Sequence, residues 1–107
     1  MKKRQLSEMW RGWFIGDFEP SVFKTSDFEI GLLTHTKGET WPKHYHKIAT
    51  EYNLLVSGSM SICGEEILPG EIFVLEPGEI AEPTFHEDCK IVCIKTPSLP
   101  KDKYEVF

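Results

Sequence analysis

Residues 38–58 read GETWPKHYHKIATEYNLLVSG, and this stretch decides the fold. Side chains two positions apart in a β-strand point to the same face, so His44 and His46 can converge on one point. Glu51 lies beyond residues 47–50, in the next expected strand, and can bring a carboxylate to the same place. Two imidazoles and one carboxylate suit a divalent transition metal and leave coordination positions open for water, substrate or dioxygen. The stretch therefore predicts a metal site of the catalytic kind.

The spacing of this stretch resembles the first sequence motif of the cupin superfamily. That motif is a glycine, five residues, His-x-His, three or four residues, a glutamate, six residues and a glycine. The matching residues are Gly38, His44, His46, Glu51 and Gly58. The resemblance covers roughly residues 28–97 and implies an all-β jelly-roll (double-stranded β-helix) barrel with a ligand site inside its mouth.

The second cupin motif is matched less well. It has a glycine, five residues, Pro-x-Gly, two residues and a histidine, whereas this chain has Gly70, residues 76–78 as Glu-Pro-Gly, and then Ala81. The usual third histidine is missing, so only the two histidines and the glutamate of the first motif carry over. Glu82 and His86 are candidates to complete the site if a β-bulge shifts the strand.

Strand signals dominate the rest of the chain, and we expect an all-β fold. Short runs rich in Ile, Leu, Val and Thr alternate with turns at Gly and Pro. The expected strands are residues 28–36, 51–56, 60–63, 67–68, 72–75 and 90–95. Short strands between such turns are typical of a sandwich or barrel rather than of βαβ units. Residues 2–10 are the only stretch expected to form a helical turn or two.

The 107 residues are enough for one domain and too few for two, so residues 1–107 are predicted to form a single cupin domain. Its barrel core spans about residues 28–97. An aromatic N-terminal segment, residues 10–18, and the tail, residues 98–107, are expected to pack on the barrel. The apolar end of the tail forms either a final strand or a contact with a second subunit, and we favour the strand.

Charge and composition narrow the range of partners and compartments. The net charge is −5, and cations cluster only at residues 2–4, so nucleic acid is not an expected partner. The chain has no apolar run of the length that crosses a membrane and no apolar core of a secretory signal, which favours a cytoplasmic protein. Cys63, Cys89 and Cys93 are expected to be reduced thiols, and Cys89 and Cys93 are expected to be small buried side chains. Cys89 and Cys93 are alternatively candidates to join the metal site.

Other residues leave their roles open. His35 sits in an alternating run and faces either the barrel interior or solvent, with a structural role as the default. Trp41 and Tyr52 are candidates to line a pocket, although core packing is favoured for each. The residues of strand 51–56 are apolar on both faces, with Leu54 on one and Leu55 on the other. One face fills the barrel, so the other needs cover, either from the N-terminal aromatic segment or from a second subunit, and we expect a homodimer.

Three functions are consistent with these residues, each with a small polar molecule, for example a sugar or nucleotide sugar, as the ligand. In the first, Fe, Mn, Ni or Zn held by His44, His46 and Glu51 acts as a Lewis acid or activates oxygen, as in an oxygenase or isomerase. In the second, a sensor or binding protein grips the ligand without breaking a bond. In the third, a metal-free isomerase or epimerase uses a histidine as general base, paired with an acidic group.

Overall fold

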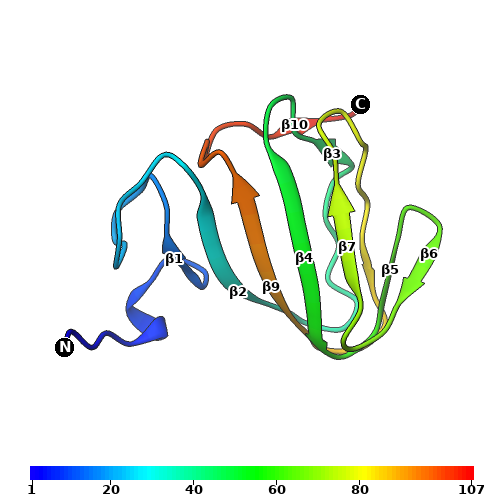
Figure 1. The fold of residues 1–107 in the computed structure, drawn as a ribbon. Coiled ribbons are helices and arrows are strands. Elements are labelled where there is room, and N and C mark those ends of the chain that lie inside the picture. The colour runs from blue at the N-terminus through cyan, green and yellow to red at the C-terminus, as the bar shows by residue number, and fades with distance from the viewer.

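The computed structural model describes residues 1–107 and contains two antiparallel β-sheets that share one core (Figure 1). The larger sheet has the strand order β1-β2-β9-β4-β7, and the smaller has the order β6-β5-β8. A separate pair joins β10 to β3. The elements, in chain order, are the 3₁₀ turn η1 (Leu6–Glu8), β1 (Trp13–Ile15), β2 (Glu29–His35), β3 (His44–Tyr45), β4 (Thr50–Ser57), β5 (Met60–Ile62), β6 (Glu65–Ile67), β7 (Ile72–Leu75), β8 (Thr84–Phe85), β9 (Cys89–Thr96) and β10 (Tyr104–Glu105). The all-β prediction is confirmed.

Alternation along the strands sorts side chains between the two faces of the five-stranded sheet. In β4, Asn53 and Leu55 are buried, whereas Tyr52, Leu54 and Val56 are exposed. Successive side chains of a strand point to opposite faces, so the buried pair faces the interior and the other three face outward. The outward apolar face expected from the sequence is therefore present.

The apolar core fills one end of the space between the sheets. Strands from both sheets and the segment between β7 and β8, which contributes Ala81, supply its nine buried members, which are Leu55, Met60, Ile62, Ile67, Leu75, Ala81, Phe85, Cys89 and Ile91. Trp41 and Phe73 pack against this cluster while remaining partly buried. The inward side chains near the other ends of β2, β4 and β9 are polar or charged, and this difference positions the site.

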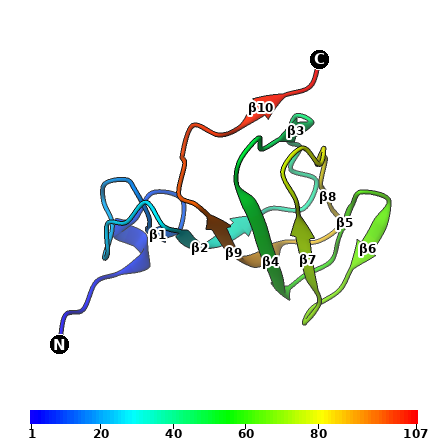
Figure 2. The same cartoon turned by 45° about the horizontal axis from the view of Figure 1, so that its top comes forward.

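The C-terminal tail is bound to the barrel as a strand. β10 pairs with β3, so Tyr104 lies opposite Tyr45 and Glu105 opposite His44 (Figure 2). The buried carboxylate of Asp102 accepts hydrogen bonds of 2.9 to 3.0 Å from three consecutive backbone N–H groups, those of residues 47–49. The expected final strand is confirmed, and it braces the segment that carries the two histidines.

Several expectations shift or fail in detail. The strand expected at residues 67–68 is β6, Glu65–Ile67, and the helical turn is limited to η1. The sequence did not predict β1 or β8, because each has only two or three residues and shows no clear alternation, whereas the strand expected at the first histidine is present as the two-residue β3. All three cysteines are free, Cys63 is exposed, and Cys89 and Cys93 are buried as expected. No helix in the chain is both long enough and apolar enough to cross a membrane.

Candidate active site

A pocket of about 510 Å³ occupies the open end of the barrel. Its apolar floor includes Leu33, Met60 and Ile91 from strands of both sheets. His44, His46 and Glu51, the residues singled out by the first motif, line its polar part. The structure therefore brings the three predicted site residues into one pocket.

Strand register places charged side chains in a row at the polar end. Lys95 of β9 lies opposite Glu29 of β2 on one side and opposite Glu51 of β4 on the other. Cys93 lies two residues from Lys95 on the same face, flanked by Gly31 and Asn53. A row of three side chains, a lysine between two glutamates, thus runs across the inner face of the sheet beside the histidines.

Backbone pairing and oxygen acceptors hold the two histidines. The backbone of His44 exchanges hydrogen bonds of 3.1 and 2.8 Å with Ala81 across a β-bridge. The Nδ1 of His44 lies 3.1 Å from the carbonyl oxygen of Pro42, and a carbonyl only accepts, so this nitrogen carries the proton. The Nε2 of His44 is then an unprotonated base. The rings of His44 and His46 meet edge to face with centroids 5.6 Å apart.

His46 faces a carboxylate on one side and has an orphaned nitrogen on the other. Its Nδ1 lies 3.6 Å from Oε2 of Glu51, longer than a hydrogen bond but close enough for the carboxylate to stabilise a proton there. The Nε2 of His46 is buried and has no hydrogen-bond partner in the protein. A buried polar atom without a partner is costly and calls for an explanation at a functional site.

The environment keeps both imidazoles uncharged. Burial lowers the pKa of His46 below 6.5, and the nearby Lys95 ammonium adds to this, while Glu51 opposes it. Burial also lowers the pKa of His44, and the positive charge of Lys103 works in the same direction. Both rings are therefore neutral at neutral pH and able to accept a proton.

The donors present do not fit a three-ligand metal centre. One oxygen of Glu51 faces His46, and the other accepts a hydrogen bond of 3.3 Å from the Cys93 thiol. The ammonium-bearing Lys95 is the cross-strand neighbour of the same glutamate. No three His, Cys, Asp or Glu side chains of the chain are arranged to hold a metal ion. Glu51 acts as an oxygen acceptor beside His46 and the Cys93 thiol. The metal centre expected from the sequence stays a prediction.

The candidates for completing the site lie elsewhere. Ala81, at the position of the missing histidine, lines the pocket opposite His44. Glu82 is exposed and pairs with Lys43 at 3.6 Å. His86 is exposed and lies 2.6 Å from the hydroxyl oxygen of Ser61. Neither Glu82 nor His86 lines the pocket.

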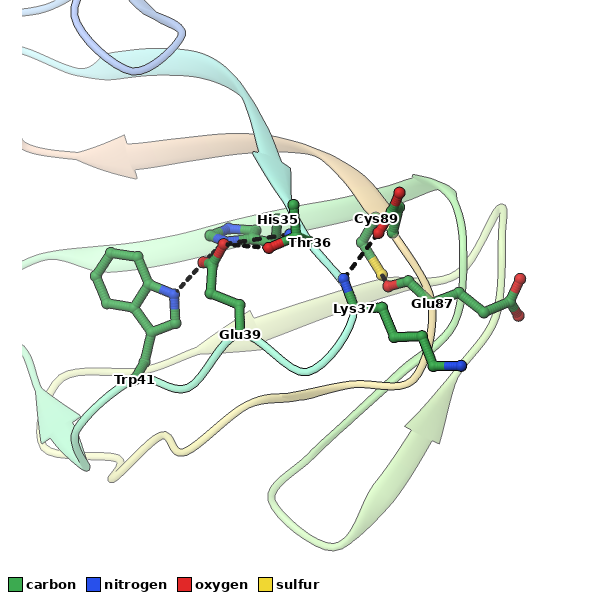
Figure 3. Close-up of polar contacts among 8 residues, drawn as sticks. His35, Thr36, Lys37, Glu39, Trp41, Glu87 and Cys89 are labelled. Atoms are coloured by element: carbon green, nitrogen blue, oxygen red, sulfur yellow. Dashed lines mark hydrogen bonds and ion pairs between the residues drawn. The ribbon is translucent and has the colours of Figure 1, made fainter.

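A second histidine and carboxylate pair, His35 with Glu39, lies beside the first site, and the sequence left His35 undecided (Figure 3). Oε2 of Glu39 lies 2.6 Å from Nδ1 of His35 and accepts a hydrogen bond of 2.5 Å from the Trp41 indole. The His35 ring stacks on Phe85 with centroids 4.4 Å apart. Burial alone would raise the pKa of Glu39, but these hydrogen bonds and one from Thr36 outweigh it and lower the pKa to about 2. His35 and Trp41 both line the pocket, which the sequence did not establish.

The sequence analysis also missed charged residues that line the pocket. Glu29 lies in phase with Gly31 and Leu33 on β2, and Lys95 lies in phase with Ile91 and Cys93 on β9. A charged residue on the apolar face of a strand was the available signal, because such residues are rarely buried without a role. Burial raises the pKa of Glu29 and also that of the Cys93 thiol.

Solved structures share this architecture at low sequence identity. An uncharacterised protein with a double-stranded β-helix domain from Klebsiella pneumoniae subsp. pneumoniae MGH 78578 matches with a TM-score of 0.69 and 16% identity, over 79% of this chain and 75% of that one. The polyketide cyclase RemF from Streptomyces resistomycificus matches with a TM-score of 0.67 and 20% identity, over 78% of this chain and 63% of that one. The chain adopts the cupin fold.

Other proteins that share this fold are larger than the chain. The DMSP lyase DddQ from Ruegeria pomeroyi DSS-3 matches this cupin barrel with a TM-score of 0.70 and 16% identity. The match covers 86% of this chain and 48% of the lyase. No family model matches the chain, and a search of curated proteins finds no match. Similarity at these identities shows the fold alone, so the chemistry has to be inferred from the residues of the pocket.

Proposed function

We propose that this cupin binds a small polar molecule in its pocket and transfers a proton on it without a metal, as an isomerase or epimerase does. The observation that carries the proposal is the pair of neutral imidazoles, each with Nδ1 facing an oxygen acceptor. A neutral histidine whose other nitrogen is oriented by an acceptor is the usual form of a general base.

The surroundings of His44 and His46 suit the two rings to different roles. His44 is only half-buried and lines the pocket, so its unprotonated Nε2 is the better placed to take a proton from a ligand carbon next to a carbonyl. The electron pair of that C–H bond then moves onto the carbonyl oxygen and forms an enolate. His46 is almost fully buried beside Glu51, whose carboxylate stabilises the imidazolium form of that ring. Delivery of a proton from the other face, by a second acid or by water, completes an epimerisation, and return of the proton to the adjacent carbon together with a proton shift between the two oxygens completes an isomerisation.

The chemistry named for some fold neighbours is compatible with this proposal. They include a sugar phosphate isomerase from Silicibacter pomeroyi DSS-3 at 16% identity and the polyketide cyclase at 20% identity. Those activities belong to those proteins. They support the choice of proton-transfer chemistry as the first to test in this barrel.

Solvent deuterium exchange tests the proposal before the substrate is known. The protein is incubated in D₂O with a panel of small aldoses, ketoses, hydroxy-keto acids and their phosphates, and loss of C–H signals is followed by ¹H NMR. We expect exchange next to the carbonyl of at least one compound, and His44→Gln should slow it by about a hundredfold or more. The matched control His86→Gln changes an exposed histidine outside the pocket and should leave the rate unchanged.

Two outcomes would replace the proposal with its rivals. Exchange that stops on exhaustive chelation and returns with one divalent metal would favour the metal-dependent enzyme predicted from the sequence. Saturable binding with no exchange for any bound compound would favour a non-catalytic binding protein.

A further inference from the structure

Three cations line the pocket without a carboxylate partner. They are Arg11 in the N-terminal segment, Lys95 on β9 and Lys103 in the tail. None of the three forms an ion pair, whereas Lys24 and Lys43 at the surface pair with glutamates. Three regions far apart in the chain thus bring unpaired positive charge to one pocket.

Each of these cations lies over the ring of a tryptophan. The distances to the ring centroids are 5.0 Å for Arg11 on Trp10, 5.1 Å for Lys95 on Trp13 and 4.3 Å for Lys103 on Trp41. These are the three tryptophans of the chain, and all of them line the pocket. A cation–π contact at a partly exposed site is worth only about 0.5 to 1 kcal/mol, so it holds a cation in place and leaves it free to bind an anion.

Glu29 and Glu51 flank Lys95 and offset part of this charge, but neither lies within ion-pair distance of the three cations. Burial raises the pKa of Glu29, and the charge of Lys95 opposes that rise. Glu19, also at the pocket, is already paired with Lys24 at 3.5 Å. Burial lowers the pKa of Lys103, the charge of Lys95 and to a smaller extent that of Arg11 lower it further, and Glu51 and Glu105 oppose the shift. The cations therefore repel one another, and a bound anion relieves that repulsion.

The backbone at Arg11 is unfavourable for an arginine. Arg11 has a φ of 50° and Gly12 a φ of 88°, in a turn closed by a 3.0 Å hydrogen bond from the Trp13 N–H to the Trp10 carbonyl. A left-handed conformation costs a residue with a side chain about 1 to 2 kcal/mol, and Gly or Asn fits it better. The turn holds Arg11 between two of the pocket tryptophans, and strain of this kind concentrates at functional sites.

We infer that Arg11, Lys95 and Lys103 form a binding site for the anionic group, a phosphate or a carboxylate, of the molecule that enters this pocket. The three residues are called the cationic collar. The inference rests on the proposed function only for what happens to the ligand afterwards, because binding at the collar requires no reaction. It narrows the substrate class to small molecules that carry a negative charge.

Binding of simple anions tests the collar directly. The probes are inorganic phosphate, acetate, and glucose 6-phosphate compared with glucose, with heats of binding measured by calorimetry. Tryptophan fluorescence reports on the same site, since every tryptophan of the chain carries one of the three cations. We expect saturable binding of glucose 6-phosphate with a change in fluorescence, a loss of affinity at higher salt, and no response to glucose. Phosphate and acetate distinguish the two kinds of anion.

Matched lysine variants locate the site. Lys95→Gln and Lys103→Gln should each weaken binding about tenfold, as expected for loss of one charge-assisted contact. Lys90→Gln on the same strand and Lys101→Gln in the same tail make the same change in net charge outside this pocket and should bind as the wild type does. Equal weakening of binding by all four variants would show that only the net charge of the protein matters, and would overturn the collar. The absence of binding to any anionic probe at millimolar concentration would also overturn it.

Glu51→Gln separates this inference from the proposed function. It removes a negative charge beside Lys95, so anion binding should persist or strengthen. The same change should impair proton exchange, because His46 loses its carboxylate. Loss of exchange with intact anion binding in Glu51→Gln supports both proposals. Unchanged exchange and unchanged anion affinity in both Lys95→Gln and Lys103→Gln would overturn the collar and leave the proton-transfer proposal unaffected.

Discussion

The two cupin motifs of this chain differ in what they preserve. The first, residues 38–58, keeps both its glycines and its chemical side chains, whereas the second, residues 70–81, keeps glycines but has Ala81 in place of a histidine. The two segments nevertheless pair in the barrel, through the bridge between His44 and Ala81 and a 2.7 Å hydrogen bond from the Gly78 N–H to the His46 carbonyl. Main-chain pairing and turns are enough to build this part of the barrel, and side-chain chemistry can change on it independently.

The largest expected effect compares one glycine from each motif. Gly58 has a φ of 94°, and a Cβ there would overlap the carbonyl oxygen of Asp88, whereas Gly78 has a φ of 88° with open space around it. Gly58→Ala should lower the free energy of unfolding by about 3 kcal/mol or more, since it adds a clash to backbone strain. Gly78→Ala should cost about 1 kcal/mol from strain alone. Denaturant unfolding measures both, and equal losses would show that the two turns are equally constrained.

The second expected effect concerns the outer face that β4 and β7 build together. Leu54 lies opposite Ile72, and Tyr52 opposite Val74, with exposed fractions of 36 to 69% among these four residues. We expect this apolar face to be covered by a second copy of the chain, so light scattering should give about twice the 12.3 kDa chain mass. Leu54→Glu should weaken the dimer by at least about a hundredfold, because it would bury an unpaired charge.

The control for the dimer is a charge placed away from that face. Ser61→Glu adds the same charge on β5, in the smaller sheet, and should leave the mass at the dimer value. A wild-type mass that stays at that of one chain on concentration would refute the dimer. The apolar face would then be solvent-exposed in the isolated protein.

The third prediction concerns a histidine introduced at the position where the second motif has Ala81. Ala81→His would place an imidazole in the pocket opposite His44, next to a second histidine that already has a free Nε2. Zinc or nickel affinity, measured by calorimetry with elemental analysis, should rise at least about tenfold over the wild type. Glu82→His puts the same side chain one position away on the outward face and should give no gain. Stoichiometric metal already present in the wild type would contradict the conclusion that Glu51, occupied by His46 and the Cys93 thiol, does not fit a metal centre.

The smallest expected effect is a pH dependence carried by Glu39 of the first motif. Its folded pKa of about 2 lies below the ordinary value of 4.5, so its stabilising contribution is present above pH 4.5 and is lost as the pH falls toward 2. Glu39→Gln should flatten the fall in stability over that window by about 1 kcal/mol, a discounted figure because the side chain is partly exposed. Glu76→Gln, an exposed glutamate in the second motif, should leave the curve unchanged. An unaltered curve in Glu39→Gln would show that its hydrogen bonds to His35 and Trp41 are absent in solution.

The sequence alone determined the class of fold and the location of the site. Short strands punctuated by Gly and Pro predicted an all-β protein, and the resemblance of residues 38–58 to the first cupin motif implied the cupin barrel. Both depend on local rules, since strand alternation and turn glycines are encoded by neighbouring residues. For the same reason the placement of His44, His46 and Glu51 in one pocket could be expected from residues 38–58.

Only the tertiary structure decided what those three residues can do together. It placed Cys93 and Lys95 beside Glu51, and the tail lysine Lys103 near the histidines, from positions about 40 or more residues away in sequence. It also turned His35 toward the pocket and left Glu82 and His86 outside it. The physical reason is that a ligand set, a neutral imidazole or an unpaired cation depends on which charges approach through space. Strand pairing across the barrel sets those approaches, and no local pattern in the sequence encodes them.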